Sequence, residues 1–451
     1  MKRFLAAALA ASMVLMTAGC AGGTTSESSA DSGSATSAPV TEGKPVEESS
    51  APSESTSEDT SAEDTSSDAT TSEDASSEID YSTLTEEEIY DLMIERSLIT
   101  TGDTTRMSNV LKRAQNGETI TAAYIGGSIT EGYHDGLTLK EDEKWAKMST
   151  TYLAEQFPDA TFNYVNAGIS GTPSVLGNVR LERDVLSSDP DIVFVEFAVN
   201  DGGETIYKNA YESLVRTLLA DERDIAVVLL FTIVENGHTC QPHMTQIGER
   251  YDLPMISLPD SIWVEMQEGR MIWDDYSGDG SHPHVEGGKM IRDMVIHYYE
   301  NVIPEIDANA GDVDNTLPEP VFSGDYMDMH YFDSEEFKPE LVGFAEENTH
   351  GSFQHGWGFK GDTGASMKFD ITCKKLAMVY KENNSKAFGD AEIYVDGKLV
   401  KTVSSNTASG WNNPVTTYII DEDASAAHTV EIKVAEGTKC YFGILAFGSN
   451  E

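Results

Sequence analysis

The sequence predicts a three-layer α/β domain with a doubly wound parallel sheet, followed by an antiparallel β-sandwich domain. Two observations lead to this fold class. Over residues 84–308, apolar strand patterns alternate with amphipathic helix patterns, which is typical of a parallel sheet covered by helices on both faces. Over residues 326–451, only short strand patterns separated by turn residues occur, as in a β-sandwich. Residues 309–325 are expected to link the two domains, because residues 311–320 are polar and flanked by proline.

Residues 1–19 have the pattern of a secretory signal peptide. Lys2 and Arg3 precede an apolar stretch, and small residues come directly before Cys20. This arrangement resembles the bacterial lipoprotein signal, with Thr17 where leucine is usual. The resemblance implies that Cys20 carries a lipid and anchors the protein to the extracellular face of the bacterial cell membrane. A plain secreted protein is the alternative.

Residues 20–83 consist largely of Ser, Thr, Asp, Glu and Ala, with Lys44 as the only base. Such a segment buries too little apolar surface to fold, so we expect a disordered tether. The whole chain carries a net charge of −47, which argues against nucleic acid as a partner because a phosphate-binding face needs clustered Lys and Arg.

The four cysteines are too few for a disulfide scaffold, and their spacing contains neither a CxxC pair nor a Cys/His cluster that would indicate zinc. Cys373 and Cys440 both lie in the second domain. They either form a disulfide or remain two buried thiols.

The first domain opens with a capping box, because Thr85 is followed three residues later by Glu88, and a helix is predicted as far as Leu98. Further helices are expected at residues 104–115, 144–157, 180–187, 208–220, 244–251 and 287–301. Strands are expected to end at residue 126 and to span 161–166, 191–198, 225–234 and 254–258. The second domain is expected to hold strands at 365–371, 376–381, 391–395, 398–403, 416–420, 429–434 and 441–447. Asp396 and Gly397 form a strong hairpin signal between two of these.

The chemistry is expected at the ends of the parallel strands. An apolar run ends in Gly126, Gly127 and Ser128, which places one hydroxyl at the carboxyl edge of the sheet, where α/β sheets bind ligands. We interpret Ser128 as a nucleophile. Asp279 lies three residues before His282, a spacing at which the carboxylate can fold back onto the imidazole and fix its tautomer.

A serine nucleophile also needs hydrogen-bond donors for the oxyanion. Gly171 offers a backbone N–H, and Asn200 offers a side-chain amide, each after another predicted strand. With the backbone N–H of Ser128, they would form an oxyanion hole.

Four sequence blocks together resemble the SGNH (GDSL-type) hydrolase family over about residues 109–303. They are Gly-x-Ser-Ile-Thr at 126–130, Asn-x-Gly-x-x-Gly-Thr at 166–172, Asn-Asp at 200–201 and Asp-x-x-His-Pro at 279–283. The resemblance implies that Ser128, Asp279 and His282 are catalytic, that Gly171 and Asn200 hold the oxyanion, and that no metal or organic cofactor is needed. Gly127 departs from the family pattern, whose name implies Asp.

Other polar and aromatic residues are weaker candidates. Glu131, His134 and Asp201 either contact substrate or are solvated loop residues. Trp357, with Phe353 and Phe359, either stacks on sugar or packs in a core or domain interface, and Trp411 is a separate loop candidate. A rival interpretation is a calcium loop, because residues 275–286 match part of the EF-hand spacing.

The sequence therefore predicts a serine esterase. A tethered SGNH domain with a trailing β-sandwich resembles bacterial carbohydrate esterases, and this resemblance implies removal of O-acyl groups, acetyl foremost, from polysaccharides or oligosaccharides at the cell surface. An acylated carbohydrate is the expected partner, and the β-sandwich is a possible sugar-binding domain. The alternatives are an O-acetyltransferase, a lipid or peptidoglycan esterase with the same site, and a non-catalytic carbohydrate-binding lipoprotein.

Overall fold

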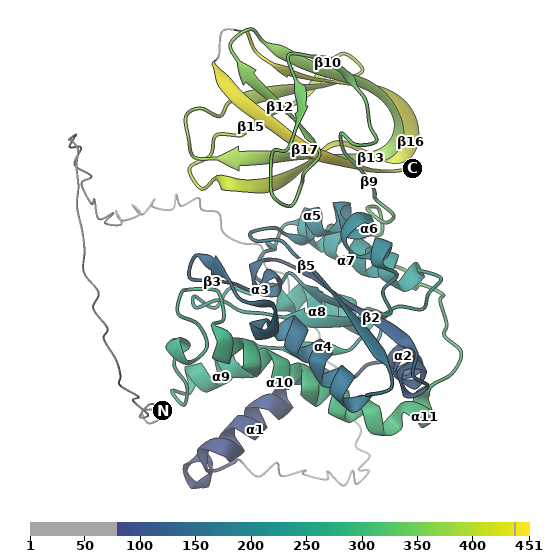
Figure 1. Cartoon of the computed structure of the whole chain (residues 1–451), viewed down its shortest axis with the longest axis vertical. Coiled ribbons are helices and arrows are strands. Elements are labelled where there is room, and N and C mark those ends of the chain that lie inside the picture. Colours follow the sequence, from purple (N-terminus) through teal and green to yellow (C-terminus); the bar gives the residue numbers. More distant parts are fainter. Residues whose placement is uncertain (1–78, 437–438) are drawn as a thin grey trace, which may run out of the picture. The chain divides into compact units, whose positions relative to one another are not determined.

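The computed structural model describes residues 79–436 and 439–451 (Figure 1). The predicted signal peptide, Cys20 and the predicted tether as far as residue 78 lie outside these residues. The described part begins slightly before the expected domain boundary: Tyr81 contacts the α/β domain, with the Arg270 guanidinium 3.9 Å from its ring centre. Within the described ranges, no helix combines the length and the apolar character that a membrane span requires.

The α/β domain contains a six-stranded sheet in the order β1-β8-β7-β6-β2-β5. Five strands are parallel, and β1 joins the edge antiparallel. Counted along the chain, the parallel strands have the spatial order 2-1-3-4-5, so the topological switch point lies between β2 and β6. The strands are β1 (Leu98–Thr100), β2 (Thr119–Gly126), β5 (Thr161–Gly168), β6 (Ile192–Glu196), β7 (Ala226–Phe231) and β8 (Met255–Ser257).

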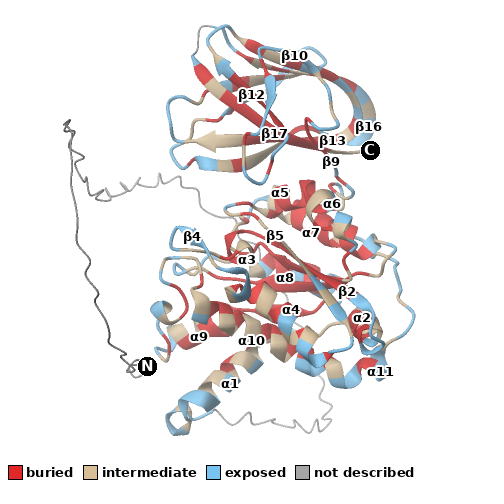
Figure 2. Cartoon of the chain, in the orientation of Figure 1, coloured by how far each residue is buried: buried red, intermediate tan, exposed pale blue. Residues whose placement is uncertain are grey.

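Helices cover both faces of this sheet, and its central strands are buried (Figure 2). In β2, Ala122 and Tyr124 face one apolar core while Ala123 and Ile125 face the other, which explains the unbroken apolar run in the sequence. One layer contains α1 (Glu86–Ser97), α2 (Thr105–Gln115), α4 (Trp145–Gln156), α9 (Ile262–Gln267), α10 (Val285–Val302) and α11 (Ile306–Asn309). The other contains α6 (Leu181–Asp184), α7 (Thr205–Ala220) and α8 (Gln241–Arg250). The predicted three-layer fold is confirmed.

Most predicted helices are present, and the capping box at Thr85 forms as expected. The helix predicted at residues 180–187 is present as the short α6 and a 3-10 turn at Leu186–Ser188, but the preceding α5 (Ser174–Val179) was missed. Gly177 in the middle of α5 obscured this helix in the sequence. Close packing leaves no room for a side chain at Gly177, since a β-carbon there would lie 2.5 Å from Cζ of Phe197.

The C-terminal domain is an antiparallel β structure, also as predicted. The strands expected at 365–371 and 376–381 form one long strand, and those expected at 416–420 and 429–434 form another. The pairing between these two long strands shifts register after Cys373 but continues beyond it. The strands are β9 (His330–Phe332), β10 (Glu340–Val342), β11 (Ala345–Glu347), β12 (Gly356–Gly361), β13 (Ala365–Asn383), β14 (Asp390–Val395), β15 (Lys398–Ser404), β16 (Trp411–Val434) and β17 (Cys440–Asn450). The predicted hairpin turn is present between β14 and β15, with φ of 52° at Asp396 and 75° at Gly397.

The two domains share an apolar interface. Along β13, Leu376 and Met378 pack inside the β domain, whereas Ala377 and Val379 pack against residues of α5 such as Leu176 and Val179. Asn178 adds a buried hydrogen bond from its Nδ2 to the carbonyl of Tyr326, at 2.6 Å. A separate apolar core at the interface therefore holds the β domain next to the carboxyl side of the sheet.

The described cysteines, Cys240, Cys373 and Cys440, are all free and buried. Of the two possibilities for Cys373 and Cys440, the structure therefore has the buried thiols.

Candidate active site

Ser128 lies at the end of β2, on the first turn of α3 (Ser128–Glu131), and is 7% exposed. The preceding residue has no room for a side chain, because a β-carbon on Gly127 would overlap the amide of Asn200. In this structure only glycine fits at position 127. This packing also brings the amide of Asn200, from the loop after β6, next to the serine.

His282 joins Ser128 to Asp279. Its Nε2 lies 2.9 Å from Oγ of Ser128, and its Nδ1 lies 2.9 Å from Oδ2 of Asp279. The structure thus brings the three predicted residues into one hydrogen-bonded chain. A neutral imidazole in this position, with its proton on Nδ1, presents an acceptor to the serine hydroxyl.

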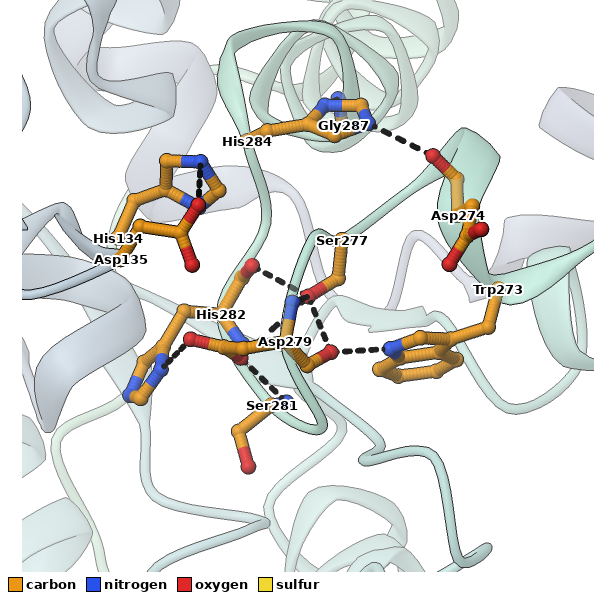
Figure 3. A network of polar contacts seen from close by, with 10 residues as sticks. All are labelled: His134, Asp135, Trp273, Asp274, Ser277, Asp279, Ser281, His282, His284 and Gly287. Carbon is orange, nitrogen blue, oxygen red and sulfur yellow. Dashed lines mark hydrogen bonds and ion pairs between the residues drawn. The ribbon is translucent and has the colours of Figure 1, made fainter. Parts of the chain in front are cut away.

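The loop before α10 holds this geometry (Figure 3). The Oδ1 atom of Asp279 accepts the backbone N–H groups of Ser281 and His282, each at 2.7 Å, so its carboxylate closes a tight turn. Ser277 donates its hydroxyl to the carbonyl of His282, and Trp273 donates its indole N–H to the carbonyl of Asp279. These contacts fix both ends of the aspartate–histidine pair.

The same turn explains the charge of Asp279. Partial burial alone would raise the pKa of this carboxyl, but hydrogen bonds from the backbone and side chain of His282 and from the Ser281 backbone hold it below its ordinary value. Asp279 is therefore an ionised acceptor at neutral pH, suited to orient the imidazole.

Gly171 lies in the turn after β5 with a φ of 69°, a conformation that favours glycine. Glu131 supports this turn: its Oε2 accepts the backbone N–H of Ser170 at 2.7 Å and the Ser170 hydroxyl as well. The candidate substrate residue Glu131 thus connects α3 to the Gly171 turn.

A cleft of about 500 Å³ opens over these groups. Ser128, Gly171, Asn200 and His282 all line it. Trp411, the first residue of β16, lines the cleft from the β domain and is 53% exposed. The site is therefore built from both domains.

Several weaker candidates lie elsewhere. The interpretation of Trp357 as a sugar contact is wrong, because Trp357 is fully buried in the core of the β domain, and Phe353 and Phe359 are buried too. Asp201 is 3% exposed and accepts the backbone N–H of Ser174 at the start of α5, so it is not available to substrate. Burial raises the pKa of Asp201 to about 7.

His134 pairs with Asp135, with 3.5 Å between Nε2 and Oδ2, and its ring packs 6.1 Å from that of His284 (Figure 3). It supports the wall behind the His282 loop and is not among the residues that line the cleft. The calcium-loop alternative has no support in this geometry, because Asp279 is committed to His282 and Glu286 pairs with Lys289 at 2.7 Å.

Two residues of the site were missed in the sequence. Tyr133 lines the cleft and packs edge-on against the His282 ring, with 4.8 Å between ring centres. Glu196 lies beneath the Ser128 turn at the end of β6. A carboxylate that ends an otherwise apolar buried strand was a signal for Glu196, whereas nothing local distinguishes Tyr133.

Comparison with known proteins identifies the family of the first domain. Residues 124–290 match the model of the GDSL-like lipase/acylhydrolase family. No curated protein matches the chain significantly. A solved two-domain esterase active on acetylated mannans, co-crystallised with mannopentaose, has a TM-score of 0.71 and 27% identity, covering 79% of this chain and 98% of that one. Another structure of a two-domain esterase active on acetylated mannans has a TM-score of 0.68 and 26% identity, covering 79% of this chain and 99% of that one.

The family match spans the nucleophile strand, the oxyanion candidates and the loop that carries Asp279 and His282. The structural match extends over both domains. The chain therefore carries a GDSL-like lipase/acylhydrolase (SGNH) domain, the catalytic domain of a carboxylic ester hydrolase, joined to a C-terminal antiparallel β domain.

Proposed function

We propose that this protein is a serine esterase that removes acetyl groups from polysaccharides or oligosaccharides. The observation that carries the proposal is the chain of hydrogen bonds from Ser128 through His282 to Asp279, at 2.9 Å for each ring nitrogen. Ser128 and His282 line a cleft large enough for a sugar residue.

In the proposed reaction, His282 takes the proton of Ser128 as Oγ attacks the ester carbonyl. Asp279 keeps the imidazole in the required tautomer and stabilises the imidazolium that forms. The N–H groups of Ser128 and Gly171 and the amide of Asn200 receive the oxyanion. Each such donor typically contributes about 3–4 kcal/mol to transition-state stabilisation. The tetrahedral intermediate then collapses, and the imidazolium protonates the sugar oxygen as its bond to the acyl carbon breaks, which releases the free sugar hydroxyl.

The second half of the reaction uses the same groups. The acyl-enzyme ester on Ser128 is attacked by water, whose proton passes to Nε2 of His282. The resulting tetrahedral intermediate collapses to acetate and regenerates the serine hydroxyl. Atoms balance without a metal or an organic cofactor.

Two features support a carbohydrate substrate. Trp411 presents an exposed aromatic ring in the cleft, and aromatic rings are suited to pack against the apolar faces of sugars. A second cleft of about 610 Å³ meets the first at Gly171 and Asn200 and is bounded on the other side by β-domain residues such as Lys401. The two clefts together offer room for several sugar units. The similar two-domain esterase is active on acetylated mannans, which makes mannan the first substrate to test.

We further propose that the protein works on the extracellular face of the bacterial cell membrane. The support is the sequence of residues 1–20, with its basic start, apolar stretch and Cys20. Incorporation of labelled palmitate in wild type but not in Cys20→Ala would support the lipid anchor. Release of both proteins into the medium would favour the secreted alternative.

The test of the activity is acetate release from acetylated mannan and acetylated xylan by wild type and by Ser128→Ala. We expect release by wild type that is lost in the variant, with an unchanged circular dichroism spectrum. Activity on short aryl acetates alone would retain the esterase and remove the glycan substrate. Transfer of acetyl to added sugar would indicate an O-acetyltransferase, and glycan binding without turnover would indicate a binding protein.

A further inference from the structure

We propose that Glu196 is a positioning residue that holds the turn carrying Ser128 in its reactive conformation. This inference rests on the proposed role of Ser128 as the nucleophile. Glu196 does not line the cleft and does not touch Ser128, so it would act only through the turn.

Glu196 is completely buried, and four donors surround its carboxylate. Its Oε2 accepts the hydroxyl of Thr130 at 2.9 Å, and its Oε1 accepts the hydroxyl of Thr232 at 2.7 Å. The backbone N–H groups of Gly127 and Thr130 also donate to it. Three of the four donors therefore belong to the turn that contains Ser128. They are the backbone N–H of Gly127, which precedes the serine, and the backbone N–H and hydroxyl of Thr130, which follows it.

The carbonyls of the turn are held by neighbouring side chains, since Trp145 donates to Ile129 and Asn166 donates to Thr130, but the amino end of the turn has no side-chain cap of its own. The residue directly before α3 is Gly127, which has no side chain with which to cap the helix. Gly126 and Gly127 are both required by close packing, since a β-carbon at either would overlap neighbouring side chains. Two consecutive glycines are conformationally permissive, so the turn depends on outside contacts for its shape.

Glu196 is well placed to provide such contacts. It pairs directly with Gly126 in the parallel register of β6 and β2, so its backbone is part of the rigid sheet. Its side chain reaches from there to the turn. A carboxylate is an acceptor only, which complements four donors, and hydrogen bonds to charged groups are stronger than those between neutral groups.

Burial raises the pKa of Glu196 to about 7, while the hydrogen bonds from Thr232, Thr130 and the Gly127 backbone oppose this effect. The buried phenols of Tyr211 and Tyr276 and the carboxyl of Asp201 are its titratable neighbours. Burying the ionised carboxyl of Glu196 costs folding free energy, yet the protein retains this carboxyl beneath the turn that carries Ser128. Such a cost is consistent with a role in activity.

Thr130 and Thr232 provide a matched pair of variants. Both residues are buried, and each donates one hydroxyl to Glu196, but only Thr130 belongs to the turn. Thr130→Val and Thr232→Val remove the hydroxyls with little change in shape. We expect kcat on an aryl acetate to fall about tenfold or more in Thr130→Val with KM within about twofold, and Thr232→Val to stay within about twofold in both constants.

A second measurement follows Ser128 itself. The rate at which a fluorophosphonate labels Ser128 should fall in Thr130→Val in parallel with kcat, and remain near the wild-type rate in Thr232→Val. Equal effects of the two variants on kcat, or no effect of Thr130→Val, would overturn the proposal. Either result would mean that the hydrogen bond between Glu196 and the turn does not affect the reactivity of Ser128.

Variants of Glu196 give an independent readout. Glu196→Gln retains an acceptor oxygen and should keep much more activity than Glu196→Leu, which retains none. If Gln and Leu lose activity equally while both fold, the positioning role is excluded. Failure of the proposed function would look different: Ser128→Ala would remain active, and the fluorophosphonate would not label Ser128 in the wild type.

Discussion

Trp411 of the β domain lies directly against Gly171 of the α/β domain: a β-carbon on Gly171 would lie 2.9 Å from Cζ2 of the indole. Gly171 is also a candidate oxyanion donor, so an aromatic ring from one domain packs on the catalytic turn of the other. The β domain therefore supplies one wall of the active-site cleft. Its contribution to activity can be separated from its contribution to stability.

Trp411→Ala should raise KM for acetylated glycan by about tenfold or more while leaving the melting temperature nearly unchanged, because the ring is 53% exposed and we expect its exposed face to contact substrate. Trp357→Ala is the matched control, since it removes the same side chain from the buried core and should cost about 3–5 kcal/mol of stability. Steady-state kinetics and thermal unfolding of both variants check this. If Trp411→Ala lowered the melting temperature and left KM unchanged, Trp411 would be excluded as a substrate contact.

Gly171→Ala should lower kcat strongly. Its φ of 69° costs an alanine about 1–2 kcal/mol, and the new methyl group would press on Trp411. Gly397→Ala is a suitable control, with a φ of 75° in a distant hairpin and no atom within 4 Å of the added carbon. Both variants should be slightly destabilised in thermal unfolding, but only Gly171→Ala should lose esterase activity. Equal activity in the two would argue against Gly171 as an oxyanion donor.

Glu131→Ala should also lower kcat, because it leaves the backbone N–H and hydroxyl of Ser170 without their acceptor and loosens the adjacent Gly171 turn. Loss of such a partner costs about 1–3 kcal/mol. KM for a small aryl acetate should change little, since the effect is on the oxyanion and not on binding. A large rise in KM with unchanged kcat would instead support the original interpretation of Glu131 as a substrate contact.

Asp201 should make the protein less stable as pH rises. Its pKa is raised from an ordinary 3.8 to about 7 by burial, so between these values the folded protein binds a proton that the unfolded chain does not. The free energy of unfolding therefore falls with increasing pH across this window. Asp201→Asn removes this effect but retains an acceptor for Ser174, so its melting temperature relative to wild type should be higher at pH 8 than at pH 5. If the melting temperatures of the variant and the wild type differed by the same amount at pH 5 and pH 8, the raised pKa of Asp201 would be contradicted.

The three described cysteines should be unreactive in the folded protein. Burial raises the pKa of Cys240 to about 12 and that of Cys373 to about 11, and it also raises the pKa of Cys440. In a Cys20→Ala variant, a thiol reagent at pH 8 should modify none of them quickly before unfolding and all three after it. Recovery of only one thiol after unfolding without reductant would show that Cys373 and Cys440 form a disulfide.

The sequence by itself determined the features that depend on local pattern. The alternation of apolar strands and amphipathic helices was enough for the three-layer domain, because each element must bury a face of fixed period. The capping box at Thr85 and the turn at Asp396 and Gly397 were predicted because their hydrogen bonds and dihedral angles are local. Four short blocks, three after parallel strands and one before α10, were enough to select Ser128, Asp279 and His282.

Only the tertiary structure decided which side chains reach the cleft. Trp357 and Trp411 stand in similar glycine-containing stretches, but one is fully buried and the other forms a wall of the site, because the difference depends on which face of the β domain packs inward. Asp201 follows Asn200 directly, yet it caps a helix start instead of facing the cleft. Glu196 contacts the Ser128 turn across neighbouring strands, 66 residues apart in the chain. Such contacts arise from strand order and packing, which no local pattern specifies.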